Sequence, residues 1–333
     1  MKCIFCLEDK PGTVEHVFPR AIGGNLKINR LCKSCNSKLG AKADPAISDN
    51  FLVRIRRSEL NLAGNSGKSP GKYELIEGVA RLASNPNIRV RVSLDRRLNK
   101  IDLQVISEPN STISEDGIVN LSYQIDPRDS SKIPQIIARE RKRIGLMPLN
   151  EDDLLEAARN TQLIESNIEN PRLIYEISHD FTYVRHGLLK IAYELAFIWL
   201  GEEYIYDDLA AHIRNALLSE DSNATSRLPI HFIEDPCGQP LDLWSDNRNS
   251  HFAFSSFHKD GICIVVRIFD LHAAAIWVSN STERYLRHFD SNKVEQFIWV
   301  DPLTRSHRVT SLQEEMRIVT EKLVRKANFE KGL

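Results

Sequence analysis

Four of the six cysteines lie within the first 35 residues, in two pairs of equal spacing, Cys3-x2-Cys6 and Cys32-x2-Cys35. Each pair places two thiols on one tight turn, and two such turns supply the four tetrahedral ligands of a structural zinc ion. Two local disulfides or a redox pair would use the same cysteines. No signal peptide precedes Cys3, so the oxidising, secreted interpretation loses its main support. We therefore expect these four thiolates to bind one structural Zn²⁺.

The segment between the two cysteine pairs contains an ordered set of acidic, basic and amide side chains. In order, its members are Glu15-His16, Pro19, Gly23-Gly24, Asn29 and, directly after Cys35, Asn36. With the cysteines, this order resembles the HNH endonuclease family, specifically its zinc-knuckle members with an E-H-[VI]-x-P-x-x-x-G-G core followed by C-x-x-C-N. The resemblance covers about residues 3–43, and its specificity comes from the combination of motifs.

The resemblance implies a β-hairpin and a helix around a catalytic metal ion, with a role for each of four residues. Glu15 and Asn36 would hold the metal, His16 would be the general base, and Asn29 would pin the loop that orients His16. A neutral imidazole can accept a proton from water near pH 7. A carboxylate with an amide oxygen suits Mg²⁺ or Mn²⁺, and one such cation can neutralise the scissile phosphate and the leaving 3′ oxygen.

Two positions depart from the common family pattern. Glu15 stands where most members have Asp, and Asn36 stands where many have His. Both variants resemble the pattern of the E-H subgroup of the family. We therefore interpret them as adjustments of the metal site and not as a loss of activity. The alternative is a non-catalytic zinc-dependent protein that binds nucleic acid or regulates a partner, in which these residues are incidental.

Charge is unevenly distributed along the 333 residues, whose formal net charge is -1. Residues 1–72 contain 13 Lys+Arg against 6 Asp+Glu, so this region is cationic and the rest is mildly acidic. A positive surplus on a small domain is typical of a phosphate-binding surface, although a solvated face has the same composition. From charge and nearness to the motif, Arg20, Arg30, Lys33 and Arg54 are the candidate DNA contacts.

The chain divides by composition into a small module and a larger body. We expect a nuclease module at 1–60, a Gly/Ser/Pro-rich linker at 61–72, and a body at 73–333 that is divisible near residue 150. The predicted fold class is α+β: a small ββα-metal, treble-clef-like zinc module followed by a larger mixed α+β domain. The body would choose the DNA target, sense a licensing signal, or hold two modules together.

Periodicity predicts the elements that must position these residues. We expect a short basic helix at 50–62, half-buried strands at 88–93 and 101–106, helices at 130–143, 151–162, 186–200 and 206–219, antiparallel central strands between 229 and 300, and a charged helix at 311–331. Glu194 follows Lys190 by one helical turn, which predicts a weak surface pair.

The remaining cysteines and histidines have no ligand spacing that predicts a second metal site. Cys237 and Cys263 are expected to be ordinary buried thiols. The histidines of this group are expected to be hydrogen-bonded or exposed, namely His179, His186, His251, His258 and His272.

The sequence therefore favours a metal-dependent DNA endonuclease that leaves 5′-phosphate and 3′-hydroxyl ends. Because one HNH site cuts one strand, we expect a homodimer, and by analogy a bacterial or phage setting such as restriction or defence. A small molecule or a modified base is the kind of activator that the body could sense. We expect a cytoplasmic protein without a membrane span, because no apolar run is long enough.

Overall fold

The computed structural model divides the chain into two compact units, residues 1–72 with 179–333 and residues 73–178. It describes residues 1–64, 67–71, 76–95, 100–107, 109–113, 119–162, 164, 167–176, 181–221, 223–234, 248–286 and 295–330. The N-terminal module thus shares a unit with the C-terminal part of the chain. This grouping differs from the expected single body at 73–333, because residues after 179 supply the helix and sheet against which the module packs.

The module consists of an antiparallel hairpin and a helix, as the resemblance implies. Strand β1 (Gly12–His16) pairs with β2 (Lys27–Cys32), and α1 (Lys33–Ser48) begins where β2 ends. A short 3-10 turn, η1 (Arg20–Ile22), precedes Gly23, whose φ of +88° is unfavourable for other residues. A Cβ on Gly23 would also lie 2.4 Å from Cα of Pro302, so the C-terminal part of the chain touches the motif loop.

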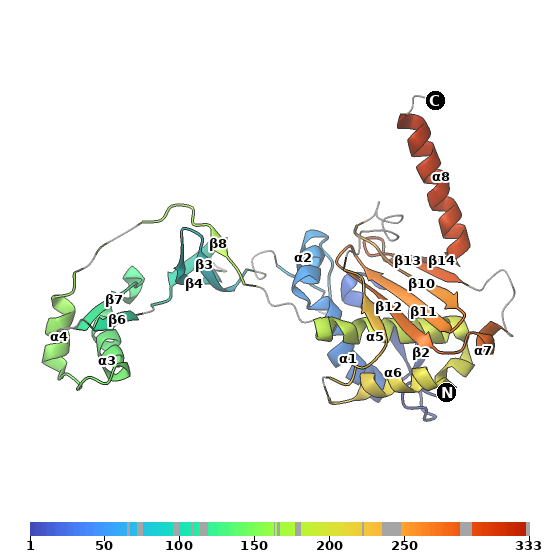
Figure 1. Cartoon of the computed structure of the whole chain (residues 1–333), viewed down its shortest axis with the longest axis horizontal. Coiled ribbons are helices and arrows are strands. Elements are labelled where there is room, and N and C mark those ends of the chain that lie inside the picture. The colour runs from blue at the N-terminus through green and yellow to red at the C-terminus, as the bar shows by residue number, and fades with distance from the viewer. Residues whose placement is uncertain are drawn as a thin grey trace. The chain divides into compact units, whose positions relative to one another are not determined.

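The first unit also contains a six-stranded antiparallel sheet, in the order β14-β13-β10-β11-β12-β9 (Figure 1). Its strands are β9 (Ile230–Phe232), β10 (His251–His258), β11 (Gly261–Ile268), β12 (His272–Ser279), β13 (Gln296–Asp301) and β14 (Ser306–Ser311). Every residue of β11 is buried, which is expected of a central strand. The predicted antiparallel central strands are therefore confirmed.

Helix α5 (Phe181–Leu200) joins this sheet to the module. It packs against β11 and β12 and also against α1. The other helices of the unit are α2 (Phe51–Glu59), η3 (Glu202–Tyr206), α6 (Asp208–Leu218), α7 (Glu283–Leu286) and α8 (Leu312–Glu330). One hydrophobic core runs from Ile4 and Phe5 through α1 and α5 to the sheet.

Helices α1 and α5 lie in close contact at Gly187. A Cβ added there would lie 2.5 Å from Cγ1 of Ile47 and 2.7 Å from the carbonyl oxygen of Ala43, both in α1. These distances are shorter than an ordinary contact of about 3.5–4.0 Å between carbon atoms. A residue without a side chain is therefore needed where α5 crosses α1.

Histidine His251 in β10 bonds to the loop that follows the Glu15-His16 pair. Its Nε2 lies 2.9 Å from the carbonyl oxygen of Ile22, and its Nδ1 accepts a hydrogen bond of 3.1 Å from the amide of Phe269. The expectation of hydrogen-bonded histidines is confirmed here. It is also confirmed for His186, which bonds to Leu217, and for His272, which bonds to Asn50. His179 lies outside the described residues.

The second unit contains a four-stranded sheet in the order β5-β4-β3-β8 and a separate hairpin. Its elements are β3 (Gly78–Leu82), β4 (Asn85–Asp95), β5 (Lys100–Val105), β6 (Pro109–Ile113), β7 (Val119–Tyr123), η2 (Pro127–Lys132), α3 (Ile133–Arg143), α4 (Glu151–Arg159) and β8 (Leu173–Ile174). Arg128 bonds to Asp126 and Asp102, and its guanidinium lowers the pKa of Asp126 to about 2. The predicted strands at 88–93 and 101–106 lie in β4 and β5.

The mixed α+β class is confirmed by both units. Among the described residues, none of the helices combines the length and the apolar character that a membrane span requires. Cys263 is buried, as expected, whereas Cys237 lies outside the described residues.

Candidate active site and metal centre

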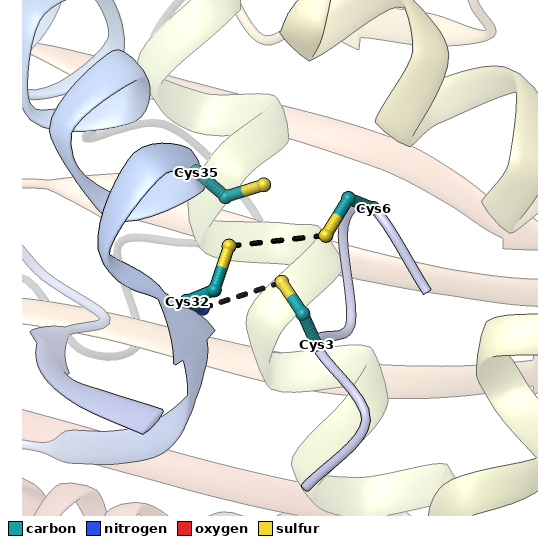
Figure 2. Close-up of side chains that lie close together, drawn as sticks. All are labelled: Cys3, Cys6, Cys32 and Cys35. Atoms are coloured by element: carbon teal, nitrogen blue, oxygen red, sulfur yellow. Dashed lines mark hydrogen bonds between the residues drawn. The ribbon is translucent and has the colours of Figure 1, made fainter. Parts of the chain in front are cut away.

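The four cysteines of the two pairs converge on one point (Figure 2). Their sulfur atoms all lie within 4.8 Å of one another, and Sγ of Cys6 is 3.8 Å from Sγ of Cys32. A tetrahedron with Zn–S bonds of about 2.3 Å requires sulfur atoms roughly 3.8 Å apart. These residues, which we call the four-cysteine cluster, therefore fit a structural Zn²⁺.

Local backbone geometry brings the four thiols together. The first pair turns through Leu7, whose φ is +60°, and the amide of Leu7 donates to the carbonyl of Cys3 at 2.9 Å. Cys32 is the last residue of β2 and directly precedes α1. Burial opposes ionisation of Cys32, but hydrogen bonds from Ser34, Cys35 and Cys3 lower its pKa to about 6. Burial raises the pKa of Cys35, an effect that a bound cation would offset.

A cavity of about 770 Å³ lies between the hairpin and α1. Five of the predicted site residues line it, namely Glu15, His16, Arg20, Lys33 and Asn36. The cavity therefore brings together the predicted base, both predicted metal ligands and two of the predicted DNA contacts.

His16 is chemically suited to accept a proton. Its imidazole is partly buried, and burial, followed by the positive charges of Lys27, Lys190 and Arg20, lowers its pKa below the ordinary value of about 6.5. The ring is therefore mainly neutral at pH 7. No hydrogen bond to this ring is found among the residues that the structure describes.

Asn36 fastens the helix to the first strand. Its Nδ2 donates to Oγ1 of Thr13 and to the carbonyl oxygen of Val14, both at 3.0 Å. The hairpin register shifts between Thr13 and Glu15, so these bonds hold β1 at its irregular point. Both contacts use the nitrogen, and neither engages the carboxamide oxygen of Asn36.

Glu15 is almost fully buried and forms an ion pair with Lys190 of α5. Burial raises the pKa of Glu15, and the ammonium of Lys190 limits the rise. A carboxylate and a carboxamide oxygen are hard ligands, and they fit Mg²⁺ or Mn²⁺ when water and phosphate complete the coordination sphere. Within the described ranges, only the four-cysteine cluster groups three or more His, Cys, Asp or Glu ligands tightly enough for a metal.

Three predicted site residues lie away from the cavity. Asn29 is exposed, its Oδ1 lies against Gly12, and no bond from it to the loop of His16 is found in the described part of the chain. Arg30 forms a bidentate ion pair with Glu202. Arg54 is half-buried in α2 and does not line the cavity.

Asp44 and Arg57 also line the cavity, and neither was among the predicted site residues. Asp44 lies two turns after Asn36 on the same face of α1, so helical periodicity could have indicated it. Arg57 is 6% exposed, and its Nη1 donates to the carbonyl of Ser48 at 2.9 Å. Its position depends on how α2 packs against the end of α1, which has no comparable sequence signal.

Lys190 was predicted to form a weak surface pair with Glu194, and this prediction is wrong. Both side chains are completely buried, with Nζ of Lys190 3.5 Å from Oε2 of Glu194. Burial raises the pKa of Glu194 well above its ordinary value. The pair is internal because α5 lies between the sheet and α1, which helical spacing alone does not reveal.

Comparison with known proteins agrees with the site over a limited stretch. Residues 3–52 match the family model described as HNH endonuclease. No curated protein and no solved structure matches the chain. The N-terminal part of the chain matches the family model, forms a hairpin followed by a helix, and contains the four-cysteine cluster. It is therefore an HNH endonuclease module.

Proposed function

We propose that the protein is a metal-dependent endonuclease that hydrolyses phosphodiester bonds of DNA. The observation that carries the proposal is the cavity in which a neutral imidazole, a carboxylate and a carboxamide oxygen meet, from His16, Glu15 and Asn36. This set can activate water and hold one hard cation. Arg20 and Lys33 supply positive charge for phosphate at the same cavity.

In the proposed reaction, His16 accepts the proton of the attacking water and is thereby charged. Glu15 and Asn36 hold Mg²⁺ or Mn²⁺, which supplies charge neutralisation at the scissile phosphate and the leaving 3′ oxygen. Arg20 and Lys33 orient the flanking phosphates. The products carry 5′-phosphate and 3′-hydroxyl ends.

Asn29, Arg30 and Arg54 have weaker support for a role in this reaction. Arg30 is paired with Glu202, and neither Asn29 nor Arg54 lines the cavity. We retain Asn29 as a supporting residue of the hairpin and the two arginines as contacts to more distant phosphates. Within the proposal, substitution of any of the three lowers activity less than substitution of His16.

The wider biological role follows from analogy with restriction and defence nucleases. In this role the protein acts in the cytoplasm as a homodimer, so that two modules cut both strands. The second unit, residues 73–178, is then the part that recognises the target or senses a modified base or a small-molecule activator.

The proposal is tested by incubating supercoiled plasmid with the purified protein and Mg²⁺ or Mn²⁺. We expect wild-type protein to nick the plasmid and His16→Ala to be at least about 100-fold slower, a typical contribution of a general base. His212→Ala is the matched control, because His212 is an exposed histidine of α6 outside the cavity. Equal nicking by His16→Ala would refute the assigned site. Absence of nicking by wild type on plain and base-modified plasmid would favour a non-catalytic zinc protein.

A further inference from the structure

The side chain of Lys190 projects from α5 and contacts three residues in the wall of the candidate active site, although it does not itself line the cavity. It is completely buried, with no exposed side-chain surface. Its Nζ donates to the carbonyl oxygen of His16 at 2.7 Å, to Asp44 at 3.2 Å, and to the carboxylate of Glu15. A fourth neighbour of this ammonium is the carboxylate of Glu194, whose Oε2 lies 3.5 Å from Nζ.

A buried ammonium group is stable only when it is paired and hydrogen-bonded. Lysine has three N–H donors, and all three of Lys190 are directed at residues of the module, namely Glu15, His16 and Asp44. The contact with Glu194 is longer and is not a hydrogen bond. The hydrogen bonds of the Lys190 ammonium are therefore made to the candidate site and not to Glu194 within α5.

Each of these bonds has a consequence for the proposed chemistry. One bond holds Oε1 of Glu15 and so fixes this carboxylate in the wall of the cavity, where it can face a cation. Another bond fixes the carbonyl of His16, from whose backbone the imidazole projects into the cavity. Neither task is performed by Asn29, to which the family resemblance assigned the orientation of His16.

Lys190 is itself held on a rigid support. It lies one helical turn after Gly187, where α5 contacts the backbone of α1. Around it, the side chains of Leu188, Leu189 and Ile191 are buried in the main core. A displacement of Lys190 would therefore require movement of the helix, so the ammonium is a fixed point for the site.

We propose that Lys190 is a positioning residue of the nuclease site, which orients His16 through its carbonyl and presents the carboxylate of Glu15 to the divalent cation. The inference rests on the proposed function. It also predicts that the ammonium weakens cation binding, because its positive charge lies beside the carboxylate that holds the cation.

The test uses full-length, zinc-loaded protein with Lys190→Met, which removes the charge and keeps an unbranched side chain that is one atom shorter. We expect kcat for plasmid nicking to fall at least about 100-fold, with little change in KM, because the base is misplaced while the phosphate contacts remain. We expect Mn²⁺ to bind about tenfold more tightly or better, as measured by electron paramagnetic resonance of free Mn²⁺. If Lys190 had a merely structural role, the substitution would lower kcat and Mn²⁺ affinity together.

Lys42→Met is the matched control. Lys42 lies on α1 but pairs with Glu220 and the carbonyl of Ser219, and it does not line the cavity. We expect wild-type kcat and Mn²⁺ affinity for this variant. If Lys190→Met does not fold, the double variant Lys190→Met/Glu194→Gln is measured in its place, because it removes a buried carboxyl together with the ammonium.

Two outcomes overturn the inference. The first is a folded Lys190 variant that nicks with wild-type kcat. The second is a folded Lys190 variant whose Mn²⁺ affinity equals or falls below that of wild type. If wild type binds Mn²⁺ but does not nick any plasmid, the proposed function fails, and the Mn²⁺ affinities alone then decide the role of Lys190.

Discussion

The close contact between α1 and α5 predicts how alanine substitution at two glycines changes the stability of the protein, and in which direction. Gly187→Ala would place a Cβ 2.5 Å from Cγ1 of Ile47 and 2.7 Å from the carbonyl oxygen of Ala43. To reach an ordinary contact, the helices must separate by about 1 Å. Such overpacking costs about 1–3 kcal/mol, and the higher helix propensity of alanine returns about 1 kcal/mol. We therefore expect a net loss of up to about 2 kcal/mol.

Gly40→Ala is the matched control on α1. No atom lies within 4 Å of a Cβ added to Gly40, so only the gain in helix propensity remains. We expect this variant to be more stable by up to about 1 kcal/mol. The two identical substitutions should therefore change stability in opposite directions.

The assay is thermal unfolding of the zinc-loaded protein, followed by circular dichroism. For a unit of this size, Tm changes by about 2–4 °C per kcal/mol. Gly187→Ala should thus lower Tm by up to about 8 °C, and Gly40→Ala should raise it by up to about 4 °C. Truncation of the clashing side chain should reduce the penalty, so Gly187→Ala should cost less in an Ile47→Ala background. An equal rise of Tm for both glycine variants would refute the close crossing of α1 and α5.

Two further predictions concern pH and zinc. Burial lowers the pKa of His251 from about 6.5 to about 4, so between these pH values the unfolded chain binds more protons at this residue than the folded chain does. The free energy of unfolding should therefore fall as the pH decreases through this window, by up to about 1.4 kcal/mol per pH unit from this residue. Urea unfolding of His251→Gln between pH 4 and 7 should show a free energy of unfolding that changes less steeply with pH than in wild type. An unchanged dependence on pH would contradict the lowered pKa of His251. Cys32→Ser should release zinc and lower the Tm of the whole first unit, because the four-cysteine cluster shares its core with α5. Zinc analysis and calorimetry check this, and a variant that keeps both zinc and the wild-type Tm would exclude a closed four-thiolate site.

Local signals were sufficient to predict the parts of the protein that depend on short stretches of chain. The spacing of the cysteine pairs predicted the four-cysteine cluster, and alternation predicted β4 and β5. Helical periodicity predicted the helix that begins at Glu151, and the side chain of Asn150 caps it: its Oδ1 accepts the amide of Asp153 at 2.8 Å. In each case the deciding interaction joins residues that are close in sequence or repeat with a fixed period.

The remaining features depend on contacts between distant segments. Lys190 is 175 residues from Glu15, and a Lys-Glu pair at helical spacing is normally a surface feature. The grouping of the module with residues 179–333 depends in the same way on the crossing at Gly187. Asp44 is an intermediate case, because the periodicity of α1 places it on the same face as Asn36.

The division of the chain also sets the order in which the site can form during synthesis. The thiols of the four-cysteine cluster and the Glu15-His16 pair emerge from the ribosome early, whereas Lys190 follows after the whole second unit. At about 5–20 residues per second, roughly 7–30 s separate the end of α1 from Lys190. A nascent or prematurely terminated chain would therefore contain the zinc ligands and the Glu15-His16 pair without the ammonium group that orients this pair. Under the role inferred for Lys190, cutting activity begins only after the core of the first unit has been translated.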